Sequence, residues 1–140
     1  MIPKLILASA SPRRLELLKN VKVNPDIIHP ANIDETIKKK EKSNFYLKRI
    51  SLEKALNVQE KYKEDIILAA DTIVSTNQKI IGKPVDDKEA VKTLKFLSGR
   101  NHNVKTGICI LFKNKKKFKI VSTKIKFKSL HQKEIDDYIK

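Results

Sequence analysis

Ser9, Arg13 and Arg14 lie where a short apolar run, residues 2–8, gives way to a predicted helix. Ser11 is suited to the N-cap position of that helix. A helix N-terminus presents free amide groups and a partial positive charge, so arginines in its first turn are unfavourable unless an anion binds there. We therefore predict a phosphate-binding turn rather than an ordinary solvated helix face.

Asp71 directly follows a fully apolar run, residues 66–70, and is predicted to lie at the edge of the core. Such a carboxylate is suited to act as a base that activates water or as a metal ligand, although a turn or cap role is equally compatible with this residue alone. Asp34 and Glu35 offer further carboxylates on a predicted loop. For that pair, taken alone, solvated charge is the simpler interpretation.

Two lysines differ from the many others by their context. Lys83 lies between Gly82 and Pro84, which hold it in place better than a lysine within a run of lysines. Lys54 lies within a long predicted helix. Lysines of this kind bind phosphate as point charges.

The remaining composition excludes several kinds of site. With three glycines the chain has no glycine-rich phosphate loop, and its three histidines are dispersed, without metal-ligand spacing. Cys109 is the single cysteine, so neither an intramolecular disulfide nor a cysteine zinc site is possible, and a buried position is the simplest expectation. What remains is an anion site of serine and arginine, several carboxylates and isolated lysines, a set that suits metal-assisted cleavage of a phosphoanhydride.

Hydrophobic patterning predicts an α/β fold with a mixed, twisted sheet flanked by helices. The predicted strands are residues 2–8, 23–29, 66–70 with an apolar continuation to 74, 79–81, 103–112 and 121–128. Four helices are predicted, and the first begins at residue 12. The second spans residues 43–62, with Ser43 as its cap and Phe45 on its apolar face. The third follows a cap at Asp86 and ends at residue 97, and the fourth runs from residue 132 to 140. We expect one domain over residues 1–140.

The net charge of +15 favours anionic partners. The excess lysines lie in runs without interleaved aromatic residues, so we interpret them as solvated surface and expect no specific nucleic-acid partner. No apolar stretch is long enough to cross a membrane, and the start of the chain does not resemble a signal peptide. Together with the single cysteine, this predicts a cytoplasmic protein without a membrane partner.

In the order and spacing of its motifs, the sequence resembles the Maf family of nucleoside triphosphate pyrophosphatases. The most specific matches are the Leu-Ala-Ser-Ala-Ser-Pro-Arg-Arg block at residues 7–14 and the Ala-Asp-Thr block that begins at residue 70. Weaker matches are residues 33–36, 49–55, 82–84, 97–99, 102–104, 106–107, 126–127 and 134–135. The resemblance implies an inosine-triphosphatase-like fold.

The resemblance also implies hydrolysis of a nucleoside triphosphate between its α and β phosphates, with a divalent cation, Mg²⁺ or Mn²⁺. Asp71 matches the base that activates water, and Glu35 and Asp71 match the carboxylates at the metal. The positions that match phosphate contacts are Ser9, Arg13, Arg14, Lys54 and Lys83. Arg13 and Thr72 match positions that mark the subgroup acting on dTTP and UTP, so the resemblance implies pyrimidine nucleoside triphosphates, including modified ones, as substrates.

Family members continue past the Glu-Ile-x-x-Tyr helix into a segment with an Asp-Lys-Ala-Gly block and a glutamine implicated in base choice. The resemblance therefore predicts either a C-terminally truncated domain or an unusually short family core. Loss of these strands would leave sheet edges and apolar faces uncovered, which favours aggregation or a homodimer. Two alternatives to an active pyrophosphatase remain at this point. One is a nucleotide-binding remnant without turnover, and the other, favoured only by the net charge, is a basic nucleic-acid-binding module.

Overall fold

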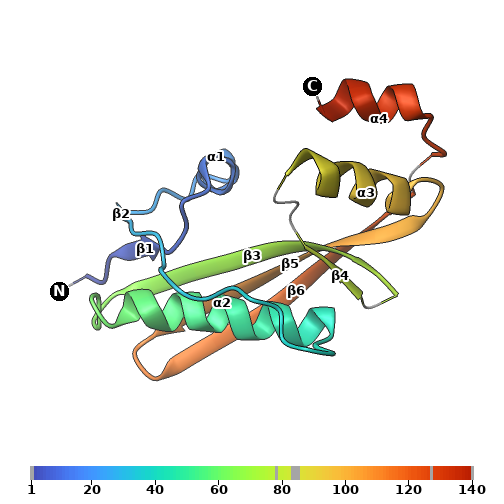
Figure 1. The fold of residues 1–140 in the computed structure, drawn as a ribbon. Helices are drawn as coiled ribbons and strands as arrows, with labels where there is room; N and C mark the ends of the chain where they lie inside the picture. The colour runs from blue at the N-terminus through green and yellow to red at the C-terminus, as the bar shows by residue number, and fades with distance from the viewer. Residues whose placement is uncertain (1, 78, 83–85, 127, 140) are drawn as a thin grey trace.

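A six-stranded mixed sheet organises the part of the chain that the structure, a computed structural model, describes: residues 2–77, 79–82, 86–126 and 128–139 (Figure 1). The strands are β1 (Leu5–Leu7), β2 (Ile27–Ile28), β3 (Ile66–Thr76), β4 (Lys79–Ile81), β5 (Asn101–Phe112) and β6 (Lys115–Lys126). The helices are α1 (Pro12–Asn20), α2 (Ser43–Gln59), α3 (Asp87–Leu97) and α4 (Gln132–Ile139). The predicted class, a mixed sheet flanked by helices, is confirmed.

Strand order decides where the sheet leaves backbone groups unpaired. The order is β2-β1-β3-β5-β6, with β1 parallel to β2 and β3, and with β3, β5 and β6 antiparallel. Pairing with β5 covers one edge of β3 over residues 66–75. On the other edge, β1 pairs as far as Leu68 and β4 begins at Val74. An open stretch of the β3 edge therefore separates β1 from β4.

The core lies between the sheet and α2, which runs along one face of it (Figure 1). Helix α1 and the pair α3 and α4 lie on the other side of the sheet. Gly107 of β5 permits the close approach of α2, because a Cβ there would lie 3.0 Å from Leu47 Cβ and 3.2 Å from Ser51 Oγ. The fully buried apolar side chains of this layer include Ile6, Leu47, Ile50, Ala55, Ile67, Ala69 and Cys109.

Two predicted helix caps are confirmed. Ser11 is the N-cap of α1, and its Oγ accepts a hydrogen bond of 3.3 Å from the backbone N–H of Arg14. Asp86 caps α3, with its Oδ1 accepting from the N–H of Glu89 at 2.8 Å. Both caps depend only on residues close in sequence, which explains why the sequence is sufficient to identify them.

Other predictions are wrong in their details. Ser43 is the first residue of α2 rather than its cap, and its buried Oγ accepts from Lys105 Nζ at 2.9 Å. Phe45 is 70% exposed instead of packing on the core face. Strand β3 does not end before Asp71 but continues through it to Thr76, because β5 pairs along its whole length. Pairing with β5 likewise makes β6 begin at Lys115, six residues before the predicted start at residue 121.

Within the described residues, none of the helices has the length and apolarity needed to cross a lipid bilayer.

Candidate active site

The candidate active site lies at the open edge of β3, between the end of β1 and the start of β4. Residues that follow β1, the central residues of β3 and one face of α2 meet there. In α/β sheets, ligands commonly bind where neighbouring strands diverge at a change of topology. This edge satisfies that condition, since parallel pairing ends at Leu68 and antiparallel pairing begins at Val74.

Arg14 is held at this edge by three acceptors. Its Nη1 donates to Ser9 Oγ at 3.2 Å and to the backbone oxygen of Ala70 at 3.1 Å. Its Nη2 donates to Thr72 Oγ1 at 3.3 Å, and that oxygen also lies 2.9 Å from Thr106 Oγ1. Burial lowers the pKa of the Arg14 guanidinium from its usual value, and the charge of Asp71 partly offsets this effect. The guanidinium is thus fixed on the sheet edge, near Asp71.

Lys54 of α2 brings the two predicted metal carboxylates together. Its Nζ lies 2.9 Å from Glu35 Oε1 and 3.4 Å from Asp71 Oδ1. The side chains of Lys54 and Asp71 are only 15% and 13% exposed, whereas that of Glu35 is 52% exposed. One ammonium group, largely shielded from water, therefore carries ion pairs to both carboxylates.

Two further residues of α2 fix the loop that carries Glu35. Tyr46 donates its hydroxyl to the backbone oxygen of Glu35 at 2.9 Å, and Arg49 Nη2 donates to the backbone oxygen of Thr36 at 3.0 Å. Arg49 also pairs with Glu41, with Nε–Oε2 and Nη2–Oε1 distances of 2.7 Å, and its guanidinium lowers the pKa of that carboxyl. The loop is therefore held to the helix through its backbone.

The sequence does not single out Tyr46, and it indicates Arg49 only as the first residue of the family match at residues 49–55. Burial, together with the charges of Asp71 and Glu35, raises the pKa of Tyr46 to about 12. Polar residues three positions apart lie on one face of a helix, so Tyr46 and Arg49 share a face with Lys54 nearby. That spacing was the signal available in the sequence.

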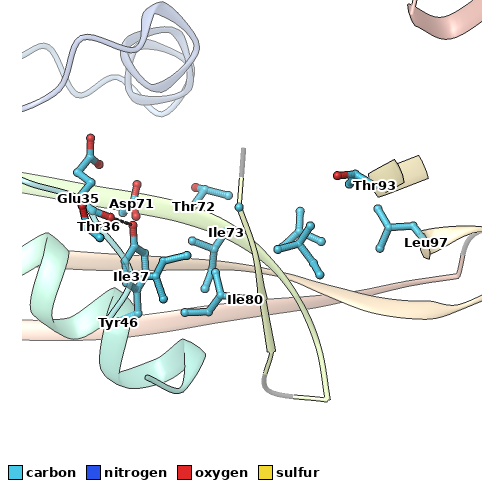
Figure 2. A pocket seen from close by; sticks show the side chains of 13 residues that line it. Glu35, Thr36, Ile37, Tyr46, Asp71, Thr72, Ile73, Ile80, Thr93 and Leu97 are labelled. Carbon is cyan, nitrogen blue, oxygen red and sulfur yellow. Dashed lines mark hydrogen bonds between the residues drawn. The ribbon is translucent and has the colours of Figure 1, made fainter. Parts of the chain in front are cut away.

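A cavity of about 530 Å³ begins at these carboxylates (Figure 2). Glu35, Asp71 and Thr72 lie at one end, and Thr93 and Leu97 of α3 lie toward the other. Most of the lining side chains are apolar or hydroxylated: Thr36, Ile37, Tyr46, Ile73, Val74, Ile80, Ile81, Thr93 and Leu97. The cavity thus joins a charged end to a mainly apolar chamber, a combination suited to a ligand with a charged and an uncharged part.

The carboxylate pair is compatible with a divalent cation. The described residues contain no group of three or more His, Cys, Asp or Glu side chains placed to hold a metal. Glu35 and Asp71 nevertheless both reach a single ammonium group, so both oxygens are close enough to share one cation. Magnesium is usually bound in this way, by one or two carboxylates with water and substrate phosphates completing its shell.

The structure brings together six of the predicted site residues: Ser9, Arg14, Glu35, Lys54, Asp71 and Thr72. Arg13 is exposed in the first turn of α1, and its side chain makes no hydrogen bond or ion pair within the described residues. Lys83 lies outside the described residues. The assembled groups combine fixed cations, which can bind phosphate, with carboxylates, which can bind a metal ion or accept a proton from water.

Comparisons with known proteins point to one family. The model of the Maf-like protein family matches residues 4–140. A relative from Zymomonas mobilis named dTTP/UTP pyrophosphatase is 44% identical over 140 residues, which are 99% of this chain and 69% of the relative. Proteins of the same name from Rhizobium etli and Clostridioides difficile are 45% and 44% identical, over 97% of this chain and 69% and 71% of their own lengths.

Solved structures agree on the fold. A HAM1 protein from Coxiella burnetii superposes with a TM-score of 0.64 at 16% identity, covering 89% of this chain and 73% of that one. A Vibrio cholerae protein gives a TM-score of 0.53 at 8% identity, covering 91% and 62%. At such low identity these structures bear on the fold alone. The family model and the relatives it agrees with show that the chain belongs to the Maf-like protein family.

Proposed function

We propose that this chain hydrolyses nucleoside triphosphates, with dTTP and UTP as preferred substrates, to the nucleoside monophosphate and pyrophosphate. The observation that carries the proposal is the meeting of Glu35 and Asp71 at Lys54, beside the fixed guanidinium of Arg14. The names of the relatives, dTTP/UTP pyrophosphatase, support the substrate and the reaction. The proposal assigns the activity to residues 1–140 as a single domain.

Asp71 is the base in this proposal. Lys54 contacts its Oδ1, so Oδ2 is the oxygen that we assign to the attacking water. The carboxylate takes the water proton as the anhydride bond between the α and β phosphates breaks, and pyrophosphate leaves with the bonding electrons. The water oxygen bonds to the α phosphorus and keeps its second hydrogen, so the reaction consumes one water.

The cationic residues hold the triphosphate. Arg14 is already oriented by Ser9, Ala70 and Thr72, so it needs little rearrangement to donate hydrogen bonds to phosphate oxygens. We assign Arg13 and Lys83 to the same polyanion, on the basis of the matching motifs. The apolar chamber beyond Asp71 is the place that we assign to the base and sugar.

A divalent cation, Mg²⁺ or Mn²⁺, completes the proposed site. Glu35 and Asp71 are the residues that hold it, and when bound it neutralises charge on the phosphates and polarises the bond that breaks. Glu35 depends on Tyr46 and on the loop backbone for its placement, since its own side chain is half exposed.

Incubation with dTTP or UTP and Mg²⁺ or Mn²⁺ tests the proposal. We expect pyrophosphate release, and we expect Asp71→Asn to lower kcat by about 10²–10⁴-fold, the usual contribution of a general base. Asp137→Asn is the matched control, because it makes the same chemical change on the exposed face of α4 and should retain full activity.

Well-folded wild-type protein that releases no pyrophosphate from any nucleoside triphosphate would contradict the proposal. Saturable binding of the triphosphate without turnover would instead identify a nucleotide-binding remnant.

A further inference from the structure

Lys54 has an unusual position for a residue assigned to phosphate. Its Nζ is directed at the two carboxylates, 2.9 Å from Glu35 and 3.4 Å from Asp71, rather than into solvent. Its side chain is 15% exposed, and it projects from the middle of α2, whose neighbouring residues Ile50, Ala55 and Val58 are buried in the core. Helix α2 therefore holds the base of this side chain in a position from which the ammonium group reaches both carboxylates.

The same two carboxylates are the ones that suit a divalent cation. A cation that binds them while Lys54 remains in both ion pairs meets an ammonium group at close range, in a region where water screens charge poorly. Of these three side chains only Glu35 is well exposed, so movement of Glu35 alone relieves little of the repulsion at Asp71.

We propose that Lys54 competes with the divalent cation for Glu35 and Asp71 in the nucleotide-free protein, so that cation and triphosphate bind cooperatively. The inference rests on the proposed function, because it takes the triphosphate to supply the oxygen anions that Lys54 lacks. When phosphate oxygens accept the ammonium group, the two carboxylates become available to the cation. By thermodynamic linkage, the cation then raises the affinity for the nucleotide by the same factor.

Lys54 thus has a different role in the nucleotide-free and the nucleotide-bound protein. Without nucleotide it neutralises part of the negative charge of the pair, which limits the binding of cations to the vacant cavity. With nucleotide it becomes a phosphate ligand, as the motif suggests. No other described cation contacts both carboxylates, since the guanidinium of Arg14 is engaged with Ser9, Ala70 and Thr72.

Titration of the protein with Mn²⁺, followed by the electron paramagnetic resonance signal of the free ion, tests this inference without turnover. We expect nucleotide-free Lys54→Met to bind Mn²⁺ about 5–150-fold more tightly than wild type, the usual range of a coupling between sites. Lys54→Arg keeps the positive charge and should stay close to wild type. Lys128→Met is the matched control, because it removes a lysine paired with Glu134 at 2.7 Å on the protein surface.

The second arm adds a UTP analogue whose α,β-bridging oxygen is replaced by an imido group. Chelation of Mn²⁺ by the analogue is common to all variants, so only the difference between them reports on Lys54. We expect the analogue to raise Mn²⁺ affinity more in wild type than in Lys54→Met.

Unchanged or weaker Mn²⁺ binding by nucleotide-free Lys54→Met overturns the inference, as does equally tightened binding by Lys54→Arg. If Lys54→Met does not fold, Lys54→Gln replaces it in both arms, because it also removes the positive charge. Failure of the analogue to bind contradicts the proposed function instead, while the nucleotide-free arm still tests the competition.

Discussion

Arg14 has its orientation fixed before any ligand arrives, because its guanidinium already donates to Ser9, Ala70 and Thr72. A planar guanidinium can serve three acceptors in a fixed geometry, and a lysine ammonium at the end of a flexible stem cannot reproduce it. The side chains assigned to the substrate from sequence thus have a second role, since Ser9 and Thr72 orient the arginine itself.

Arg14→Lys keeps the charge but loses this orientation. We expect kcat/KM for dTTP or UTP to fall by about 10–100-fold, corresponding to the loss of one or two hydrogen bonds to a charged group. Steady-state kinetics measure the change. Arg100→Lys is the control, since Arg100 stacks on Phe96 instead of contacting the site. An Arg14→Lys enzyme with wild-type kcat/KM would show that charge alone is sufficient.

Tyr46 gives the molecule a defined response to alkaline pH. Its pKa is raised to about 12 in the folded protein, from the usual value of 10.0. At a pH between these two pKa values, Tyr46 is ionised in the unfolded chain but still protonated in the folded state. The contribution of Tyr46 to the free energy of unfolding is therefore complete below pH 10 and is lost as the pH rises toward 12. We expect a loss of about 1–2 kcal/mol, since water at the cavity wall screens part of the effect.

Urea unfolding of wild type and Tyr46→Phe from pH 8 to about pH 11 measures this loss. The difference in unfolding free energy between the two proteins should change only above about pH 10. Tyr138→Phe, at a position 80% exposed, should follow wild type throughout. A constant difference between wild type and Tyr46→Phe would mean that this phenol is not responsible.

At the scale of elements, the contact between α2 and the sheet determines the site, because α2 supplies Lys54, Tyr46 and Arg49 while β3 supplies Asp71. Asp71 pairs in register with Gly107 of β5, a residue against which α2 packs without room for a Cβ. Any displacement of α2 from Gly107 therefore alters the distance between Lys54 and Asp71.

Gly107→Ala tests this contact. The added Cβ would lie 3.0 Å from Leu47 Cβ and 3.3 Å from the backbone oxygen of Leu47, which cannot rotate away. We expect a loss of about 1–3 kcal/mol in unfolding free energy from overpacking, more than the roughly 0.5–1 kcal/mol that alanine gains in a strand.

Chemical denaturation measures the change, and Gly82→Ala is its control, because no atom lies within 4 Å of a Cβ at that position. Equal stability of the two variants would show that α2 accommodates the methyl group.

The sequence was sufficient wherever structure depends on near neighbours. The caps at Ser11 and Asp86, and the break after Leu97, follow from local chemistry and are confirmed. Asp71 interrupts an apolar run, and nothing local indicates that the strand continues through it. Only pairing with β5, which lies more than thirty residues away in sequence, keeps Asp71 in β3.

The site shows the same division. Arginine and serine residues at a helix N-terminus predict a phosphate-binding site, because these residues and the helix end are adjacent in the sequence. The association of Glu35 with Asp71 was instead implied by the family resemblance, because it depends on Lys54 bridging a loop and a strand. The Tyr46 hydrogen bond to the backbone of Glu35 was not predicted, since it requires the loop to pass over α2.

At the scale of the whole molecule, the excess of lysine and arginine gives the chain a strongly positive net charge. The net charge is +15, and the lysines of β6 lie along an exposed strand at the edge of the sheet. A field of this sign attracts a nucleoside triphosphate from a distance and raises the rate of encounter. Exposed charges at the strand edge also oppose pairing of β6 with β6 of a second copy.

We expect kcat/KM for UTP to fall by tenfold or more, within the range of roughly 10–10³ for electrostatic steering, as ionic strength rises from about 0.01 M to about 1 M. Over that range the Debye length shortens from about 30 Å to about 3 Å, so distant lysines cease to act on the substrate. Replacing Lys115, Lys116 and Lys117 by glutamate should flatten this dependence and leave kcat at saturating UTP unchanged, because these exposed residues pair with residues 110–112 of β5, whereas Asp71 lies in register with Gly107. Steady-state kinetics across a potassium chloride series provide the measurement. If the triple variant keeps the full salt dependence, these three lysines do not contribute to the steering of the substrate.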